Sequence, residues 1–148
     1  MNITIRKINE ADYPGLLSLF KEFAYFQKMP DKMTNSIELM HVEKDHIMGF
    51  VAVSGAEGLV GYATGFFAYF TWIGKSMYMD DLYVKPEYRD KGIGTKLIRS
   101  MIDLAKQEKC KKLRWQVSGW NQPAIEFYKS LGATIDDTEY NCDLPLNN

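Results

Sequence analysis

The sequence of 148 residues has few of the side chains that build metal centres or disulfide frameworks. It contains two histidines and two cysteines, Cys110 and Cys142. The cysteines have neither metal-ligand spacing nor a paired motif, which indicates reduced thiols in a cytoplasmic protein. His41 and His46 stand in a charged stretch without further ligands nearby, so we expect no bound metal.

Long apolar runs and an excess of charge of either sign are also missing. No stretch of about 18 apolar residues occurs, and residues 1–13 lack the apolar core of a signal peptide. The formal net charge of −1 provides no positive field that would attract nucleic acid. We therefore expect neither a membrane nor a nucleic acid as a partner.

What is present is enough apolar material for a core. Hydrophobic residues make up 46% of the chain and aromatic residues 14%, which argues against disorder. No repeat and no linker rich in proline, glycine or serine divides the sequence. Residues 1–148 are therefore predicted to form a single domain.

Alternation and helical periodicity predict an α/β fold, an α+β sandwich around a mixed sheet. The expected strands cover residues 2–8, 47–54, 59–72, 76–84, 112–118, 133–135 and 139–144. The expected helices cover residues 15–27, 36–43, 94–109 and 121–131. Residues 78–118 read as strand, helix, strand, which favours a parallel strand pair.

The stretch from Met79 to Leu97 organises the rest of the chain. A strand-like run ends at Val84, and a turn leads into Arg89-Asp90-Lys91-Gly92-Ile93-Gly94 before an amphipathic segment. Glycines let the backbone approach a ligand, and the first amides of a helix favour an anion. The loop lacks the lysine of a Walker P-loop and the third glycine of a dinucleotide site. Taken alone, it fits an anion site or a tight turn equally well.

Two motifs together resemble the GNAT superfamily of N-acetyltransferases. Arg-x-x-Gly-x-Gly at Arg89–Gly94 is similar to the acetyl-CoA loop of that family, and Asn121 to Ala133 matches its pattern Asn-x-x-Ala-x-x-Phe-Tyr-x-x-x-Gly-Ala. With Asp80-Asp81 and the segment Thr71–Lys75, the chain looks most like the spermidine/spermine and thialysine N-acetyltransferases. The resemblance implies a mixed, mostly antiparallel sheet with helices on both faces and a parallel strand pair splayed at the acetyl-CoA site.

The resemblance also implies an activity and an assembly. The expected reaction is direct transfer of acetyl from acetyl-CoA to a primary amine of a small cationic acceptor, in the EC 2.3.1 class. A polyamine, a diamine and a lysine-like amino acid all fit as acceptors. The expected assembly is a homodimer, and no metal is implied.

By the same resemblance, the cofactor lies along the strand end, the glycine loop and the last helix. The residues so implied are Leu82, Tyr83, Val84, Arg89, Asp90, Lys91, Gly92, Ile93, Gly94, Thr95, Asn121 and Lys129. Of these, the backbone of Leu82 and Val84 is expected to pair with the pantetheine arm. The amides from Arg89 to Thr95 are expected to hold the pyrophosphate.

Tyr128 and Asp80 are the catalytic candidates. In the family, a tyrosine at the position of Tyr128 lies beside the CoA sulfur, and a phenol with a pKa near ~10 can donate to a thiolate with a pKa near ~8.5. Asp80 is the candidate base, directly or through water. Strand alternation places Asp80 and its neighbour Asp81 on opposite faces. By residue type alone, packing explains Tyr128 better than catalysis does, and a solvated strand end is the alternative for Asp80.

The acceptor candidates are acidic or aromatic. They are Asp81, Trp72, Glu22 and Phe26. Carboxylates bind a cation by charge, and the aromatic rings bind it by cation–π contact. Core packing is the alternative for the two aromatic residues.

Two other functions stay open on the sequence. One keeps the fold and changes the acceptor to a protein N-terminus or a lysine side chain. The other is a non-catalytic module that binds acyl-CoA for regulation. Such a module keeps the loop and Asn121 but needs neither Tyr128 nor Asp80, which are both present.

Overall fold

The computed structural model describes residues 2–148, which separate into two compact units. The first unit ends at Gln116 and contains the whole sheet. The second begins at Val117 and contains one helix and the C-terminal segment. The expectation of a single domain stays a prediction.

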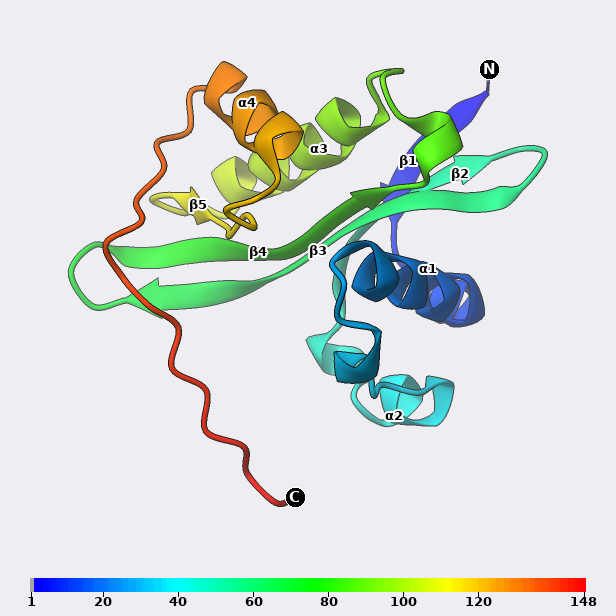
Figure 1. The fold of residues 1–148 in the computed structure, drawn as a ribbon, viewed down its shortest axis with the longest axis horizontal. Coiled ribbons are helices and arrows are strands. Elements are labelled where there is room, and N and C mark those ends of the chain that lie inside the picture. Colours follow the sequence, from blue (N-terminus) through cyan, green and yellow to red (C-terminus); the bar gives the residue numbers. More distant parts are fainter. Residues whose placement is uncertain (1) are drawn as a thin grey trace. The chain divides into compact units, whose positions relative to one another are not determined.

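Within residues 2–148, five strands form one sheet in the order β1-β2-β3-β4-β5 (Figure 1). They are β1 (Ile3–Lys7), β2 (Met48–Ser54), β3 (Gly58–Phe70), β4 (Gly74–Val84) and β5 (Leu113–Arg114). Neighbouring strands run antiparallel, except that β5 runs parallel to β4. The predicted mixed, mostly antiparallel sheet with one parallel pair is confirmed.

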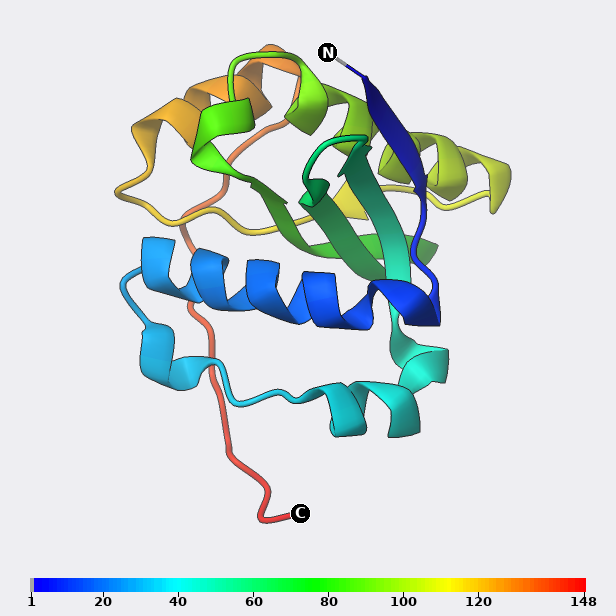
Figure 2. The ribbon, with the colours of Figure 1, turned by 90° about the vertical axis from the view of Figure 1, so that its right-hand side faces the viewer.

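Helices cover both faces of this sheet, as Figures 1 and 2 show. The first unit contains α1 (Tyr13–Phe26), α2 (Ile37–Val42) and α3 (Ile93–Gln107). Four short 3-10 turns accompany them: η1 (Glu10–Asp12), η2 (Pro30–Lys32), η3 (Lys44–His46) and η4 (Pro86–Tyr88). On one face, Gly61 and Gly65 leave room for Leu97 and Met101 of α3.

The other face of the sheet packs against α1. Its buried cluster combines α1, α2 and the middle of the sheet, and consists of Tyr13, Leu16, Leu19, Met40, Val51, Tyr62 and Tyr83. The leucines recur at the spacing that puts them on one side of a helix. This packing fixes α1 against β3 and β4, where the candidate site lies.

The start of α1 is tied to the first strand. The two terminal nitrogens of the Arg6 guanidinium, Nη1 and Nη2, donate to the buried Asp12 carboxylate at 2.8 and 2.7 Å. The amide of Asn9 donates to the same carboxylate at 2.8 Å. The bond from Arg6 is the main reason that the pKa of Asp12 is lowered. These bonds set the direction in which α1 leaves β1.

The second unit contains α4 (Gln122–Ser130). The Asn121 side chain accepts a hydrogen bond from the amide of Ala124 at 3.3 Å, which caps the helix start. Gly132, with φ of 93°, follows the helix end, and its amide donates to the carbonyl of Lys129. The predicted helix and its glycine cap are confirmed.

The strand predictions fail after β4. The strand expected over residues 112–118 is reduced to Leu113–Arg114, and residues 115–148 contain no strand. The strands expected at 133–135 and 139–144 are therefore wrong. An apolar, β-rich run becomes a strand only where a neighbouring chain accepts and donates its backbone hydrogen bonds, and the sequence does not specify that partner.

Candidate active site

A β-bulge in β4 shapes the candidate site. Asp81 pairs with Thr64 of β3 and Met79 pairs with Gly65, so Asp80 is left as the extra residue. Tyr83 and Tyr78, on either side of the bulge, pair with Tyr62 and Phe66.

The bulge puts Asp80 and Asp81 on one face. Tyr83 lies in the cluster under α1, so alternation puts Asp81, two residues earlier, on that face. Phe66 lies four residues after Tyr62 in β3 and therefore shares its face. Tyr78 stacks on Phe66, so Tyr78 lies on this face too, and so does Asp80, two residues further along β4. The expectation of opposite faces was wrong because strict alternation does not continue through a bulge.

The two carboxylates sit in an environment that resists ionisation. The Tyr62 hydroxyl donates to Oδ2 of Asp81 at 3.2 Å. Burial raises the pKa of Asp81 to about 6, with a contribution from the charge of Asp80, while the bond from Tyr62 acts in the opposite direction. Partial desolvation also raises the pKa of Asp80, although water reaches part of this residue. A carboxylate with a pKa near neutrality is suited to exchange a proton at neutral pH.

Beside these carboxylates, the pairing of β4 with β5 is short. Within the described residues, its register covers Met77 and Tyr78 of β4. The amide of Lys85 donates to the carbonyl of Val60 in β3, so alternation turns the backbone groups of Leu82 and Val84 to the opposite edge. The carbonyl of Val84 accepts from Nε of Arg89 there, and an extended ligand could pair with the remaining backbone groups. Tyr83 has its backbone toward β3 and its ring under α1, and its predicted cofactor contact stays a prediction.

The glycine loop ends at the start of α3. Gly92 adopts φ of 80°, a left-handed conformation that favours glycine, and α3 begins at Ile93. The amide of Lys96 makes the first bond of the helix, to the carbonyl of Gly92 at 3.1 Å. The amides of Ile93, Gly94 and Thr95 precede that bond, so they point out of the helix start. This donor set fits a pyrophosphate.

Gly94 leaves space over the loop. A Cβ atom built there would have the Val84 side chain as its near neighbour, at 3.9 Å, which is an ordinary contact. The fold therefore does not need glycine at this position for its own packing. The space fits a ligand that approaches the backbone, as acetyl-CoA is expected to do.

Arg89 is held away from this helix start. Its amide donates to the carbonyl of Pro86 at 3.2 Å, and its Nε donates to the carbonyl of Val84 at 2.8 Å. Its guanidinium carbon lies 4.8 Å from the ring centroid of Phe26. The predicted contact of Arg89 with phosphate, like those of Asp90 and Lys91, stays a prediction.

A cavity of about 330 Å³ lies beside the end of α1. It is lined by Glu22, Tyr25, Phe26, Tyr83 and Pro86. The Tyr83 hydroxyl donates to Oε1 of Glu22 at 3.1 Å, and Nζ of Lys85 lies 3.3 Å from Oε2. Burial, helped by the Glu22 charge, raises the pKa of Tyr83 to about 12. The structure thus brings together two of the predicted acceptor residues, Glu22 and Phe26.

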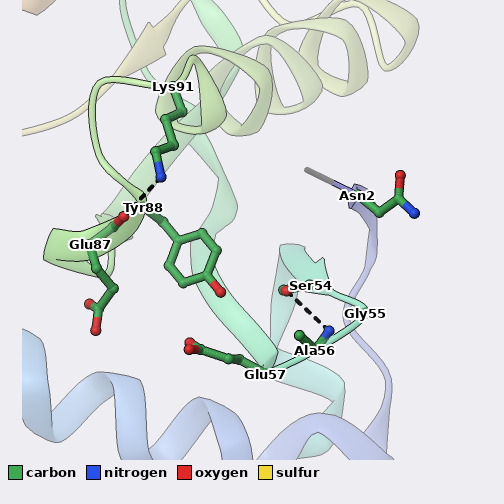
Figure 3. Close-up of a pocket in the computed structure, with 8 residues that line it drawn as sticks. All are labelled: Asn2, Ser54, Gly55, Ala56, Glu57, Glu87, Tyr88 and Lys91. Carbon is green, nitrogen blue, oxygen red and sulfur yellow. Dashed lines mark hydrogen bonds between the residues drawn. The ribbon is translucent and has the colours of Figure 1, made fainter.

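A larger, open hollow of about 700 Å³ lies between the β2–β3 turn and η4 (Figure 3). Asn2, Ser54, Gly55, Ala56, Glu57, Glu87, Tyr88 and Lys91 line it. Nζ of Lys91 donates to the carbonyl of Glu87 at 3.2 Å, which turns this side chain toward η4. Neither carboxylate of the bulge lines this hollow.

Trp72 does not join the carboxylates. It lies on the turn between β3 and β4 with 97% of its surface exposed. Asp81 is seven residues along β4 from Gly74 at this turn, or about 23 Å at ~3.3 Å per residue. The long hairpin carries the tryptophan away, and its role in binding stays a prediction.

Three further candidates belong to the second unit. Asn121 caps α4, and Tyr128 and Lys129 lie in its last turns. The ring centroid of Tyr128 lies 5.5 Å from that of Phe127. Their expected contacts with the cofactor stay predictions.

The sequence reasoning did not select three aromatic residues of the α1 face: Tyr62, Phe66 and Tyr78. Phe66 and Tyr78 stack with ring centroids 5.2 Å apart, next to Asp80 in β4. Tyr62 and Phe66 are four residues apart in a predicted strand, and this spacing already indicated that they share one face.

Among residues 2–148, no three His, Cys, Asp or Glu side chains are grouped in a way that could hold a metal ion. In the same residues, no helix combines the length and the apolar character needed to cross a bilayer.

A mixed sheet with a glycine loop at a helix start is the arrangement expected of a CoA-dependent acyltransferase. The sequence pattern of the acetyltransferase (GNAT) family matches residues 5–133, and the chain belongs to this family. It is an enzyme of the transferase class, and the family implies acetyl-CoA as its cosubstrate.

Relatives with curated names include amine acetyltransferases. The chain is 36% identical to a thialysine N-epsilon-acetyltransferase of Bos taurus over 142 residues, which cover 88% of this chain and 84% of the relative. It is 30% identical to the spermidine/spermine N(1)-acetyltransferase-like protein 1 of Homo sapiens, covering 87% of this chain and 20% of that protein.

Solved structures show the same fold. An integron cassette protein from the mobile metagenome of V. cholerae matches with a TM-score of 0.77 and 25% identity, over 99% of this chain and 94% of the other. An aminoglycoside acetyltransferase from an uncultured soil metagenomic sample matches with a TM-score of 0.79 and 22% identity, over 98% and 97%. The second likeness concerns the fold alone.

Proposed function

We propose that this enzyme transfers acetyl from acetyl-CoA directly to a primary amine of a small cationic acceptor, such as a lysine-like amino acid, a diamine or a polyamine. The names of the thialysine and spermidine/spermine relatives support this class of acceptor. We further propose that residues 1–148 act as one catalytic domain, because the family match of residues 5–133 continues past the boundary after Gln116.

The observation that carries the proposal is the pair of carboxylates that the bulge turns to one face. An alkyl ammonium has a pKa near ~10.4, so loss of its proton at neutral pH costs on the order of 4–5 kcal/mol. Asp81 attracts the cation, and Asp80 accepts its proton directly or through water. Glu22, Phe26 and Trp72 are proposed to bind the rest of the acceptor by charge and cation–π contact.

The neutral amine then attacks the thioester carbonyl carbon, so the C–N bond forms as the C–S bond breaks and its electron pair stays on sulfur. The Tyr128 hydroxyl donates to the leaving thiolate, and the proton that the acylated nitrogen loses is passed through water to restore the phenol. The backbone of Leu82 and Val84 positions the pantetheine arm, while the amides at the start of α3, Asn121 and Lys129 bind the remainder of acetyl-CoA. A cytoplasmic homodimer is the proposed form of the enzyme.

Release of free CoA thiol from acetyl-CoA, measured with a panel of amines, tests the proposal. The panel contains thialysine, lysine, ornithine, spermidine and a peptide with a free N-terminus and a lysine. We expect release with at least one small amine and little release without acceptor. Release with the peptide alone would replace the small acceptor by a protein. Binding of acetyl-CoA without release on any acceptor would favour the regulatory module.

A further inference from the structure

The side chain of Tyr62 is completely buried, yet its polar end reaches the candidate site. Its exposed fraction is 0%, and its ring packs edge-on against Phe20 of α1, with centroids 5.0 Å apart at 68°. The hydroxyl donates to Oδ2 of Asp81 at 3.2 Å. A buried phenol needs a hydrogen-bond partner, and here that partner is a carboxylate beside the bulge.

Several ionisable groups surround this pair. Asp80, on the same strand, repels the charge of Asp81, and both carboxylates act on the Tyr62 phenol. Tyr83, opposite Tyr62 on the neighbouring strand, donates to Glu22 of α1, and Lys85 balances that carboxylate. The hydrogen bond from Tyr62 is the one favourable contact of the Asp81 carboxylate among those that set its pKa.

We propose that Tyr62 is a positioning residue for the amine acceptor: its hydroxyl fixes Oδ2 of Asp81, which leaves Oδ1 to receive the cation. The inference rests on the proposed function. It adds a residue that acts through Asp81 and does not itself touch the acceptor.

The carboxylate needs this support because of its surroundings. Burial and the neighbouring charge of Asp80 both favour the neutral form of Asp81, which attracts a cation far less. A rotating, protonated side chain would also lose its alignment with Asp80. The phenol opposes both effects because it is itself immobilised under α1.

The chain provides a matched control in Tyr13. This tyrosine belongs to the same buried cluster, with 3% of its surface exposed, but its ring lies 5.0 Å from that of His41, near the start of α1. Tyr13→Phe and Tyr62→Phe both remove one phenolic hydroxyl from the core. Only Tyr62→Phe removes a donor to Asp81.

The first experiment follows the Asp81 carboxyl carbon by NMR during a pH titration of the parent protein and both variants, after circular dichroism has shown that they are folded. Hydrogen bonds to charged groups are strong, so we expect Tyr62→Phe to raise the pKa of Asp81 from about 6 by about one pH unit. Tyr13→Phe should leave it in place. Equal titration of Asp81 in all three proteins would overturn the inference.

The second experiment measures kcat/KM for the best amine as a function of pH. In Tyr62→Phe, the acid limb should move up with the pKa of Asp81, so KM for the amine should rise about twofold at pH 7 and approach about tenfold near pH 5. KM for acetyl-CoA should not change. An unmoved acid limb and an unchanged KM for the amine would overturn the positioning role.

The two experiments separate this inference from the proposed function. If no amine is acetylated by the parent enzyme, the proposed function fails, whatever the titration of Asp81 shows. If the parent enzyme acetylates an amine and Tyr62→Phe behaves like Tyr13→Phe, the proposed function stands and the positioning role fails.

Discussion

The guanidinium of Arg89 lies over the ring of Phe26, with 4.8 Å between the guanidinium carbon and the ring centroid. The same guanidinium lies 5.5 Å from the centroid of Tyr83, and its Nε donates to the carbonyl of Val84. Arg89 follows η4 and precedes the glycine loop, whereas Phe26 ends α1. One side chain therefore links the loop before α3 to the cavity at the end of α1.

Replacing the planar head of Arg89 should weaken this link. Lysine cannot reproduce both the stack and the Nε bond, so Arg89→Lys should lower the free energy of unfolding by about 1 kcal/mol. In a double-mutant cycle with Phe26→Leu, we expect a coupling energy of about 0.5–1 kcal/mol from urea denaturation. Arg99→Lys on the exposed side of α3 is the control. Additive effects of Arg89→Lys and Phe26→Leu would show that the stack contributes nothing.

The two glycines of the loop should respond differently to substitution. Gly92 has φ of 80°, so Gly92→Ala should cost about 1–2 kcal/mol of stability. Gly94 has an ordinary contact distance of 3.9 Å for an added Cβ, so Gly94→Ala should leave the stability of the unliganded protein nearly unchanged.

The stabilisation of the fold by acetyl-CoA should depend on Gly94. A ligand at about 100 times its Kd stabilises the native state by about 2.7 kcal/mol, which thermal unfolding detects. Gly94→Asp adds bulk and negative charge where the pyrophosphate is expected, so it should abolish this stabilisation while the unliganded protein stays folded. A full thermal shift in Gly94→Asp would place the phosphates elsewhere.

The sequence was sufficient for most of the fold because its local patterns agree with the tertiary structure. The apolar spacing of α1, the turn before β3 and the glycine after α4 each specify an element by short-range chemistry. The short β5 and the absence of strands in residues 115–148 were not predictable in this way. They depend on which backbone lies alongside, and hydrophobic pattern does not contain that information.

The site was predictable in its residue types and less so in its geometry. Asp80 and Asp81 were selected as carboxylates, but the bulge that gives them one face arises from the register between β3 and β4. Tyr62 was not selected, because its partner Asp81 lies 19 positions away in the sequence and no local pattern connects the two. The contact of Arg89 with phosphate stays a prediction, and the position of its side chain over Phe26 depends on the docking of α1.

The raised pKa of Asp81 predicts that its ionised carboxylate lowers the stability of the fold while it supports amine acetylation. A carboxyl whose pKa is about 6 in the folded protein and about 3.9 when unfolded disfavours folding once the pH exceeds these values. Ionised Asp81 therefore lowers the free energy of unfolding at neutral pH, and this loss disappears as the pH falls from about 6 to about 4.

Asp81→Asn removes this charge and keeps an oxygen that can accept from Tyr62. At an assay pH of 7.5, about 1.5 units above the pKa of Asp81, this carboxylate is ionised in the parent protein. The variant should then have a free energy of unfolding about 1–2 kcal/mol higher, a range that allows for the partial solvent exposure of Asp81. Near pH 4 the two proteins should be about equally stable. Urea denaturation at both pH values measures the difference, and amine acetylation should fall. A variant that is less stable at the higher pH would contradict the burial argument.

Tyr128→Phe is the sharpest test of the chemistry. It keeps the ring in α4 and removes the hydroxyl, so stability should fall by about 1 kcal/mol or less. Positioned acid catalysis contributes typically 10²–10⁴-fold, so kcat should fall roughly a hundredfold or more. Affinity for acetyl-CoA should change little, because the hydroxyl acts mainly in the transition state.

The neighbouring Phe127 supplies the control for this change. Phe127→Leu alters the packing beside Tyr128, whose ring lies 5.5 Å away, without removing a hydroxyl group. Single-turnover kinetics with acetyl-CoA and the best amine isolate the chemical step from product release. If Tyr128→Phe keeps a near-normal chemical rate, Tyr128 is a packing residue. The proton must then reach the thiolate from water or from the acceptor amine, which becomes more acidic as its nitrogen bonds to the acetyl carbon.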